Sequence, residues 1–337
     1  MSTLADDYRA LVVDLDGVVY RGPQPIQPAV DALAALARHG TRVAYATNNA
    51  SRSPQEVAEH LRSFGLDVRP TEVFTSSLAG AHHLSQRLPE GARVLPVGGD
   101  GVAIALRDRG FEIVDNAEDR PAAVLQGYGP HVTAARLAEA AYAVENGAVW
   151  VATNTDRTLP TDRGVAPGNG TLVEAVAVAT GVQPETVGKP GPLLYTMAAT
   201  ALEVPAAQTL GVGDRLDTDI AGASAAGMDA LFVLSGVHGP ADLAQAPREQ
   251  RPRFVCADAG GLREPYEEPR PESGGYRIGD SVAHLSGDAI RWSDDAPQDD
   301  IVALRVVLRV VWDALDDNRI DQRSAARLAA QYGRTQE

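Results

Sequence analysis

The sequence predicts an α/β protein with a parallel-sheet core, an inserted second α/β domain and a small α+β unit at the C-terminus. Three observations support this fold class. Short uninterrupted apolar runs, typical of strands buried on both faces, alternate with helix signals. The pattern is interrupted after residue 76 and resumes near 187, and the composition changes after Cys256.

The first strand is predicted at residues 10–13 and runs directly into Asp14. A helix over 28–39 follows, with proline near its start and glycine just past its end, and residues 42–46 form a second strand. Ser53 and Glu56 have capping-box spacing around a proline, which predicts a helix that starts there and stops at Gly65. This strand–helix–strand alternation implies a parallel sheet.

The second domain is predicted at 77–186. Strands at 93–97, 122–126 and 149–153 alternate there with helices near 101–109, 133–146 and 171–180. The core pattern then resumes with a helix after Pro190, strands at 208–212 and 230–234, and a helix at 217–226 between them. We therefore expect a core made of 1–76 and 187–262.

Residues 263–275 are rich in proline, glutamate and glycine, which predicts a linker. Beyond it, residues 276–337 are expected to form a small α+β unit: a meander of strands at 276–278, 282–285 and 289–292, then a helix. Apolar residues cover a wide face of that helix from Ile301 to Leu315. So wide a face must be covered, either by the rest of the protein or by a partner.

Composition excludes several function classes. The 337-residue chain has a formal net charge of −15 and no basic run, which argues against nucleic acid and anionic membranes as partners. The one cysteine, Cys256, ends an apolar run without a histidine or second thiol beside it, so we interpret it as packing. With no apolar run of membrane-spanning length, a cytoplasmic, soluble protein is expected.

Four polar clusters follow predicted strands or begin helices. Asp14-Leu15-Asp16-Gly17 places two carboxylates past a strand end, where open α/β sheets bind ligands. Thr47-Asn48-Asn49 offers a hydroxyl, amides and backbone N–H groups that can donate to phosphate oxygens. Gly188-Lys189-Pro190 sets a lysine at a helix start, which favours an anion. Taken singly, each has a plain alternative as a turn or a solvated residue.

The fourth cluster, 213–219, carries Asp214, Asp217 and Asp219 after another apolar strand. Three carboxylates within six residues repel one another, and this favours a bound divalent cation with oxygen ligands. An acidic surface loop is the alternative for this cluster alone. Four such clusters in one chain are a specific combination.

The order of these motifs resembles the haloacid dehalogenase (HAD) superfamily of phosphatases, and within it the NagD-like branch that includes glycerol 3-phosphate and phosphoglycolate phosphatases. The resemblance spans about residues 8–256. It implies a Rossmann-like core with a large type-2 cap inserted after the second motif, and Mg²⁺ as the cofactor. It also implies a small phosphomonoester as substrate and leaves a homo-oligomer open, since relatives dimerise through the cap.

The resemblance also implies roles for the site residues. Asp14 would be the nucleophile and Asp16 the general acid and base. The phosphoryl oxygens would be held by Thr47, Asn48, Asn49 and Lys189. Magnesium would be bound by Asp14, the main-chain carbonyl of Asp16 and Asp214, with Asp219 behind them, whereas Asp217 would only orient the loop.

Substrate choice is expected in the cap, where 152–156 and 168–170 resemble loops of the glycerol 3-phosphate and phosphoglycolate enzymes. This places four residues near the leaving group: Asn154, Asp156, Arg157 and Asn169. The alternative is that they only build the loops of the cap. An aspartate expected after Tyr128 is replaced by Gly129, which weakens the transfer of any one substrate.

The C-terminal unit resembles the small acetyltransferase-like appendage of some actinobacterial relatives, but it lacks an acyl-CoA loop, and no acetyl transfer is expected. This appendage favours glycerol 3-phosphate over 2-phosphoglycolate, a sugar phosphate or pyridoxal phosphate. The rival hypothesis from another class is a binding or regulatory module that acts through the C-terminal unit.

Overall fold

The computed structural model describes residues 2–161, 163–293 and 295–333. The chain divides into two compact units: residues 1–42 with 205–337, and residues 43–204. Each is described by itself. The domain boundaries predicted at 76/77 and 186/187 differ from this division and stay a prediction.

The first unit contains four parallel strands in the spatial order β15-β14-β13-β1. Their bounds are Ala10–Val13 for β1, Thr209–Gly213 for β13, Asp229–Val233 for β14 and Phe254–Cys256 for β15. Nearly every residue of these strands is buried, as the uninterrupted apolar runs predicted. Other elements of this part are β2 (Tyr20–Arg21), β3 (Gln24–Pro25), α1 (Gln27–Arg38), α8 (Ala221–Ala225) and α9 (Pro240–Gln245).

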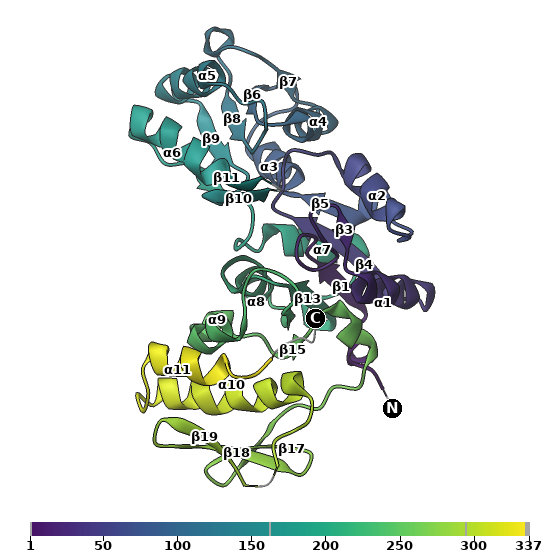
Figure 1. The fold of residues 1–337 in the computed structure, drawn as a ribbon. Helices are drawn as coiled ribbons and strands as arrows, with labels where there is room; N and C mark the ends of the chain where they lie inside the picture. The colour runs from purple at the N-terminus through teal and green to yellow at the C-terminus, as the bar shows by residue number, and fades with distance from the viewer. Residues whose placement is uncertain (1, 162, 294, 334–337) are drawn as a thin grey trace. The chain divides into compact units, whose positions relative to one another are not determined.

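The C-terminal part of this unit is an antiparallel four-stranded meander followed by two helices (Figure 1). Its elements are β16 (Arg270–Glu272), β17 (Gly275–Ile278), β18 (Ser281–Ser286), β19 (Ala289–Trp292), α10 (Asp300–Asp316) and α11 (Gln322–Ala329). The predicted linker at 263–275 is wrong from Arg270 onward. Arg270 pairs with Arg277, so β16 forms the first strand of a four-stranded meander where three strands were predicted. Proline is tolerated in β16 because it is an edge strand.

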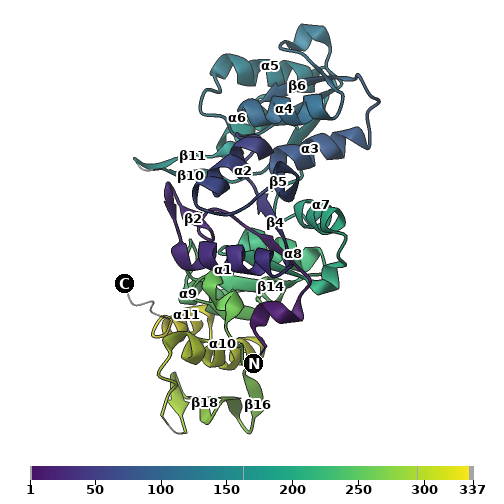
Figure 2. The same cartoon turned by 90° about the vertical axis from the view of Figure 1, so that its right-hand side faces the viewer.

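The wide apolar face of α10 is covered within the chain. Val306 and Val310 pack with Ile278 and Ala283 of the meander, and other residues of α10 contact α9, α11 and β15. The Trp312 indole Nε1 donates to the carbonyl oxygen of Leu243 at 2.9 Å. Figure 2 shows α10 and α11 as a layer between α9 and the meander. The rest of the protein therefore covers this face.

The second unit contains a pair of parallel strands, a five-stranded parallel sheet and a two-stranded hairpin. Strands β4 (Arg42–Thr47) and β5 (Val73–Thr75) pair in parallel. A second parallel sheet has the order β12-β9-β8-β6-β7, and its bounds are Arg93–Val97 for β6, Glu112–Ile113 for β7, Ala123–Gln126 for β8, Val149–Ala152 for β9 and Glu185–Thr186 for β12. These pairings confirm the predicted α/β fold class.

Helices of the second unit cover the five-stranded sheet on both faces. Helices α5 (Ala134–Glu145) and α6 (Asn169–Thr180) pack together on one face, and α3 (Ser76–Ser85) and α4 (Asp100–Asp108) lie on the other (Figure 1). The remaining elements are α2 (Pro54–Ser63), α7 (Leu193–Leu202) and the hairpin of β10 (Thr158–Thr161) with β11 (Gly164–Pro167). The capping box that starts α2 is confirmed, since the Ser53 N–H donates to Glu56 at 2.7 Å.

None of the helices in the described parts of the chain combines the length and the apolarity needed to cross a lipid bilayer. Cys256 is a buried free thiol at the end of β15, which confirms its interpretation as packing. Burial, as the largest cause, raises the pKa of this thiol to about 11.

Candidate active site

The turn after β1 is shaped by Gly17. The Asp14 N–H donates to the carbonyl of Val212 at 2.9 Å, which continues the pairing of β1 with β13 to the first carboxylate. Gly17 then takes a φ of +83°, and a Cβ there would lie 2.5 Å from Oδ2 of Asp214. Both the backbone conformation and the close approach require glycine. The sequence Asp-x-Asp-Gly therefore brings its backbone against the acidic loop after β13.

Three carboxylates meet at this strand edge. One oxygen from each of Asp14, Asp214 and Asp219 lies within 4.8 Å of the others. Asp214 and Asp219 are buried, with 1% and 3% of their surface exposed. Buried carboxylates this close together repel one another, so the arrangement favours a compensating cation. Of the three acidic residues predicted in 213–219, the structure brings Asp214 and Asp219 into this group.

The loop at 235–238 orients Asp214. The Val237 N–H donates to Oδ2 of Asp214 at 2.6 Å. A Cβ on Gly236 would lie 1.9 Å from the same oxygen, so only glycine leaves room for the carboxylate. The sequence offered a weak signal for this loop, because Ser235-Gly236 also follows a buried strand. It was missed because its contacts with Asp214 come from the backbone N–H of Val237 and from Gly236, neither of which has a polar side chain.

Asp219 and Asp217 lie in different environments. The Arg215 N–H donates to Oδ2 of Asp219 at 3.1 Å, and a Cβ on Gly213 would lie 2.1 Å from Cβ of Asp219. Asp217 instead forms a 2.9 Å ion pair with Arg215 and is half exposed. Burial acts to raise the pKa of Asp217, but the hydrogen bond and charge of Arg215 outweigh it and lower that pKa. Asp219 therefore joins the cluster and Asp217 does not.

This donor set fits Mg²⁺. Magnesium is a hard cation that takes carboxylate, carbonyl and water oxygens, and the three carboxylates supply only oxygen. Asp16 is exposed, and its carboxylate is not one of the three that the described residues bring together, so its expected contribution is the main-chain carbonyl. The residues present are consistent with the cofactor that the sequence resemblance implied.

Asn48 is the centre of a second group, which lies in the 43–204 unit. Its Oδ1 accepts the Lys189 N–H at 2.8 Å, and its Nδ2 donates to the Lys189 carbonyl at 3.2 Å. Its own carbonyl accepts from Oγ of Ser76 at 2.6 Å and from Nδ2 of Asn154 at 2.7 Å. Its Nδ2 also lies 3.4 Å from Oδ2 of Asp156. Through its side-chain amide and its carbonyl, Asn48 thus connects three segments that are far apart in the sequence.

Thr47 and Asn49, the neighbours of Asn48 in the sequence, make different contacts. Thr47 is buried at the end of β4, where its Oγ1 accepts the Asn49 N–H at 3.1 Å. The Asn49 side chain turns away to accept from the Ser51 N–H at 2.9 Å and the Ser51 hydroxyl at 2.7 Å. We conclude that Asn49 shapes the turn through its side chain.

Lys189 is buried, with 3% of its surface exposed. Its Nζ lies 5.9 Å from the centre of the Tyr195 ring, within range of a cation–π interaction. A Cβ on Gly188 would lie 2.2 Å from the carbonyl oxygen of Thr153, so the Gly-Lys-Pro motif packs directly against the loop of the cap. Buried lysines are rare, and the predicted contact of Lys189 with phosphate stays a prediction.

The cap residues are positioned around the same group. Asn154 and Asn169 are 3% and 1% exposed, and Nδ2 of Asn169 donates to the Asn154 carbonyl at 2.7 Å. The carbonyl of Asp156 accepts the Gly170 N–H at 2.8 Å. Arg157 is 76% exposed and lies 3.8 Å from Glu174. These contacts are those of loop architecture, the alternative raised for all four, and their role toward a substrate stays a prediction.

Ser76 was missed by the sequence reasoning. It is fully buried at the start of α3, and its hydroxyl donates to the Asn48 carbonyl, 28 residues away. Serine at a helix start is read as a cap, so no local pattern indicates this longer contact.

Gly129, found where an aspartate was expected, has a steric explanation. A Cβ there would lie 2.4 Å from the carbonyl carbon of Gly98 and 2.5 Å from the Gly99 nitrogen. The Gly99 N–H also donates to the carbonyl of Tyr128 at 3.0 Å. Any side chain at 129 would have to displace this backbone.

Comparisons with known proteins agree with this geometry. Models of haloacid dehalogenase-like hydrolases and of HAD-hydrolase-like proteins match residues 11–112 and 186–262. The chain is 41% identical over 324 residues to a D-glycerol 3-phosphate phosphatase of Mycobacterium tuberculosis, covering 93% of this chain and 88% of the relative. An acid sugar phosphatase of Staphylococcus aureus is 39% identical over 230 residues, covering 68% of this chain and 88% of that protein.

Solved structures show the same likeness. A glycerol phosphate phosphatase of M. tuberculosis in complex with magnesium has a TM-score of 0.83 at 39% identity and covers 93% of both chains. A p-nitrophenyl phosphatase of Archaeoglobus fulgidus has a TM-score of 0.70 at 30% identity, covering 76% of this chain and 98% of that one. With its motifs, its fold and its acidic cluster all in agreement, the chain belongs to the haloacid dehalogenase-like hydrolases.

Proposed function

We propose that this protein is a magnesium-dependent phosphatase that hydrolyses a small phosphomonoester through a covalent aspartyl-phosphate. The observation that carries the proposal is the grouping of Asp14, Asp214 and Asp219, whose oxygens lie within 4.8 Å of one another at a strand edge. A carboxylate in such a group can act as a nucleophile only if its repulsion of an anionic substrate is cancelled. Both relatives described above are named as phosphatases.

In the proposed reaction, a carboxylate oxygen of Asp14 attacks phosphorus and the bond to the leaving alkoxide breaks. Asp16 gives its proton to that alkoxide. Asp16 then takes a proton from the water that attacks the acylphosphate, which restores Asp14 and releases inorganic phosphate. The exposure of Asp16 supports this role, since its carboxyl must reach both the leaving group and water.

The cation would be held by Asp14, the main-chain carbonyl of Asp16 and Asp214, with Asp219 beside them. Bound there, Mg²⁺ supplies positive charge that offsets the repulsion between the carboxylate and the phosphate. The Val237 N–H holds one oxygen of Asp214 in place. The Arg215 N–H holds one oxygen of Asp219.

We propose that Thr47, the backbone at Asn48 and Asn49, and Lys189 bind the transferring phosphoryl oxygens. The two hydrogen bonds between the Asn48 amide and the Lys189 backbone hold these residues in one arrangement before a substrate arrives. Asn49 would contribute its N–H group, because its side chain is engaged by Ser51.

Glycerol 3-phosphate is the proposed substrate. The relative named for that substrate matches 93% of this chain, and the match therefore includes most of the C-terminal part. The acid sugar phosphatase matches only 68%. A sugar phosphate, 2-phosphoglycolate and pyridoxal phosphate are the alternatives, with Asn154, Asp156, Arg157 and Asn169 proposed to help choose among them.

Phosphate release from a panel of these esters, with and without Mg²⁺, tests the proposal. We expect turnover that stops when EDTA removes the metal and returns when Mg²⁺ is added, with glycerol 3-phosphate giving the highest kcat/KM. Turnover that survives metal removal would contradict the mechanism. Another ester at the top of the ranking would replace the substrate but leave the mechanism standing.

A binding or regulatory module remains the rival from another class. Burial of the α10 apolar face inside the chain removes the observation that favoured it. The cytoplasmic location and a homo-oligomer stay predictions.

A further inference from the structure

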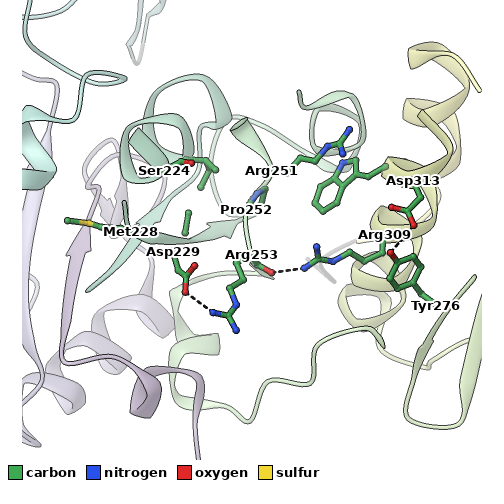
Figure 3. Close-up of a pocket in the computed structure, with 12 residues that line it drawn as sticks. Ser224, Met228, Asp229, Arg251, Pro252, Arg253, Tyr276, Arg309 and Asp313 are labelled. Atoms are coloured by element: carbon green, nitrogen blue, oxygen red, sulfur yellow. Dashed lines mark hydrogen bonds and ion pairs between the residues drawn. The ribbon is translucent and has the colours of Figure 1, made fainter. Parts of the chain in front are cut away.

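A cavity of about 300 Å³ lies in the 205–337 part of the chain and is lined by residues other than the proposed catalytic and metal-binding ones (Figure 3). Its walls come from Ile220, α8 and β14 on one side and from α10 and β17 on the other. Side chains that matter here are Ile220, Met228, Arg253, Tyr276, Arg309 and Asp313. The volume is at the lower end of the range for small-molecule sites, so a compact ligand is indicated.

Two of the three arginines in the wall are already neutralised. Arg251 donates from two nitrogens to the two carboxylate oxygens of Asp316, each at 2.8 Å. Arg253 forms 2.8 Å ion pairs with Asp229 and with Glu268. The positive charge of each of these two guanidinium groups is therefore already balanced by a carboxylate.

Arg309 is different. Its Nη2 makes one long hydrogen bond, 3.4 Å, to the main-chain carbonyl of Arg253, and its Cζ lies 5.6 Å from the centre of the Trp312 ring. Among the residues that the structure describes, no carboxylate lies within ion-pair distance of this guanidinium. The cavity therefore has one cation in its wall that lacks an anionic partner.

Asp313 contributes a negative charge to the same wall. One carboxylate oxygen accepts the Tyr276 hydroxyl at 2.8 Å, and within residues 2–161, 163–293 and 295–333 no basic side chain pairs with it. Asp313 and Arg309 are four residues apart on α10, a spacing at which such residues often pair. Figure 3 shows that they do not: Arg309 extends toward Arg253, and Asp313 faces Tyr276.

A ligand with a single charge would suit only half of this wall. A simple anion would be repelled by the carboxylate of Asp313, and a simple amine would be repelled by the guanidinium of Arg309. A zwitterion satisfies both groups and adds no net charge. Ile220, Met228 and Pro252 supply apolar surface in the same cavity.

We infer that this cavity binds a small zwitterionic amino acid with an apolar side chain. Its carboxylate pairs with Arg309, its ammonium group pairs with Asp313, and its side chain packs against Met228 and Ile220. Ile220 directly follows Asp219 in the chain, so the site adjoins the segment that carries the acidic cluster.

Titration with three matched probes tests the inference on the full-length protein. L-leucine carries both charges, 4-methylpentanoate lacks the amine and 3-methylbutylamine lacks the carboxylate. Followed by calorimetry or NMR, leucine should bind saturably and at least about tenfold more tightly than either analogue, as expected from one additional charge-assisted contact. Equal affinity for leucine and 4-methylpentanoate, or the absence of saturable leucine binding, would overturn the zwitterion assignment.

Variants provide the second arm. Arg309→Met should weaken leucine and 4-methylpentanoate but not 3-methylbutylamine, and Asp313→Asn should weaken leucine and 3-methylbutylamine but not 4-methylpentanoate. Arg309→Lys should keep most of the leucine affinity, which separates lost charge from lost packing. Arg291→Met, at an exposed arginine of β19, is the matched control. Phosphate release should be unchanged in all four, and leucine affinity that is unaffected in both Arg309→Met and Asp313→Asn would refute the site.

Discussion

The two groups of functional residues are built on opposite principles. The group in the first unit brings together the like charges of Asp14, Asp214 and Asp219, which destabilise one another until a cation arrives. The group in the second unit is centred on the neutral amide of Asn48, whose oxygen and nitrogen atoms already have protein partners. The difference teaches that the metal completes the first group, whereas the second is organised by the fold alone.

The largest expected effect tests the acidic group. Asp14→Asn removes the nucleophile while keeping the size of the side chain, so kcat should fall by roughly 10⁴-fold or more. Phosphate release from glycerol 3-phosphate measures this. Asp31→Asn, an exposed position on α1, is the control and should match the wild type. A residual rate within tenfold of the wild type would show that Asp14 is not the nucleophile.

The second prediction tests the amide group. Asn48→Ala removes two hydrogen bonds to the Lys189 backbone, and kcat/KM should fall by about 10²-fold because Lys189 loses its fixed position. Asn49→Ala is the matched comparison, since its side chain only supports the Ser51 turn. Its effect should be less than about tenfold. Equal losses in both variants would mean that Asn48 has no special part.

The third prediction separates the two acids of the loop. Asp219→Asn removes one charge from the cluster and should weaken Mg²⁺ binding by about 10–100-fold, seen as a higher Mg²⁺ concentration at half-maximal rate. Asp217→Asn breaks only a half-exposed ion pair with Arg215 and should leave that concentration unchanged. If Asp217→Asn had the larger effect, the assignment of the two residues would be reversed.

The same comparison predicts that metal removal affects only the first group. In the metal-free protein, slowed hydrogen exchange at the Lys189 N–H should persist, because its acceptor is Oδ1 of Asn48. Exchange at the Val237 N–H, which donates to Asp214, should change when Mg²⁺ is added. Equal responses at the two N–H groups would contradict the distinction between a group completed by the metal and a group organised by the fold.

The smallest expected effect lies outside both groups. Hydrogen bonds from Arg251, and then from Arg248, lower the pKa of Asp316 to about 2 against the opposing effect of burial. A carboxyl whose pKa is lower in the folded state stabilises the protein above its unfolded pKa, near 3.8, and loses this contribution as the pH falls toward 2.

Asp316→Asn should therefore cost about 1 kcal/mol of unfolding free energy at pH 7, a value discounted for solvent screening. The difference in unfolding free energy between this variant and the wild type should narrow below pH 4 in denaturant titrations, while kcat stays unchanged. The ion pair of Asp317 with Arg319 is more exposed. Asp317→Asn should therefore have an unfolding free energy closer to that of the wild type at every pH. A gap that widened on acidification would contradict the assigned direction of the pKa shift.

Local patterns predicted most of the fold because each depends on neighbouring residues. The strand at 10–13 is an uninterrupted apolar run, the strand at 93–97 is apolar after Arg93, and the observed bounds of both match the prediction. The capping box at Ser53 satisfies its own helix end. Strand β16 was missed because its sequence is that of a linker, and it becomes a strand only by pairing with β17.

What the sequence by itself determined is the set of chemical groups at strand ends: the Asp-x-Asp-Gly turn after β1 and the acidic loop after β13. Only the tertiary structure decided which of these groups meet. The Asn48 amide bonds to Lys189 across 141 residues, and Asp219 rather than Asp217 joins Asp14 and Asp214. The physical reason is that a strand or a turn is specified by nearby side chains, whereas the partners of a carboxylate or an amide depend on packing between distant segments.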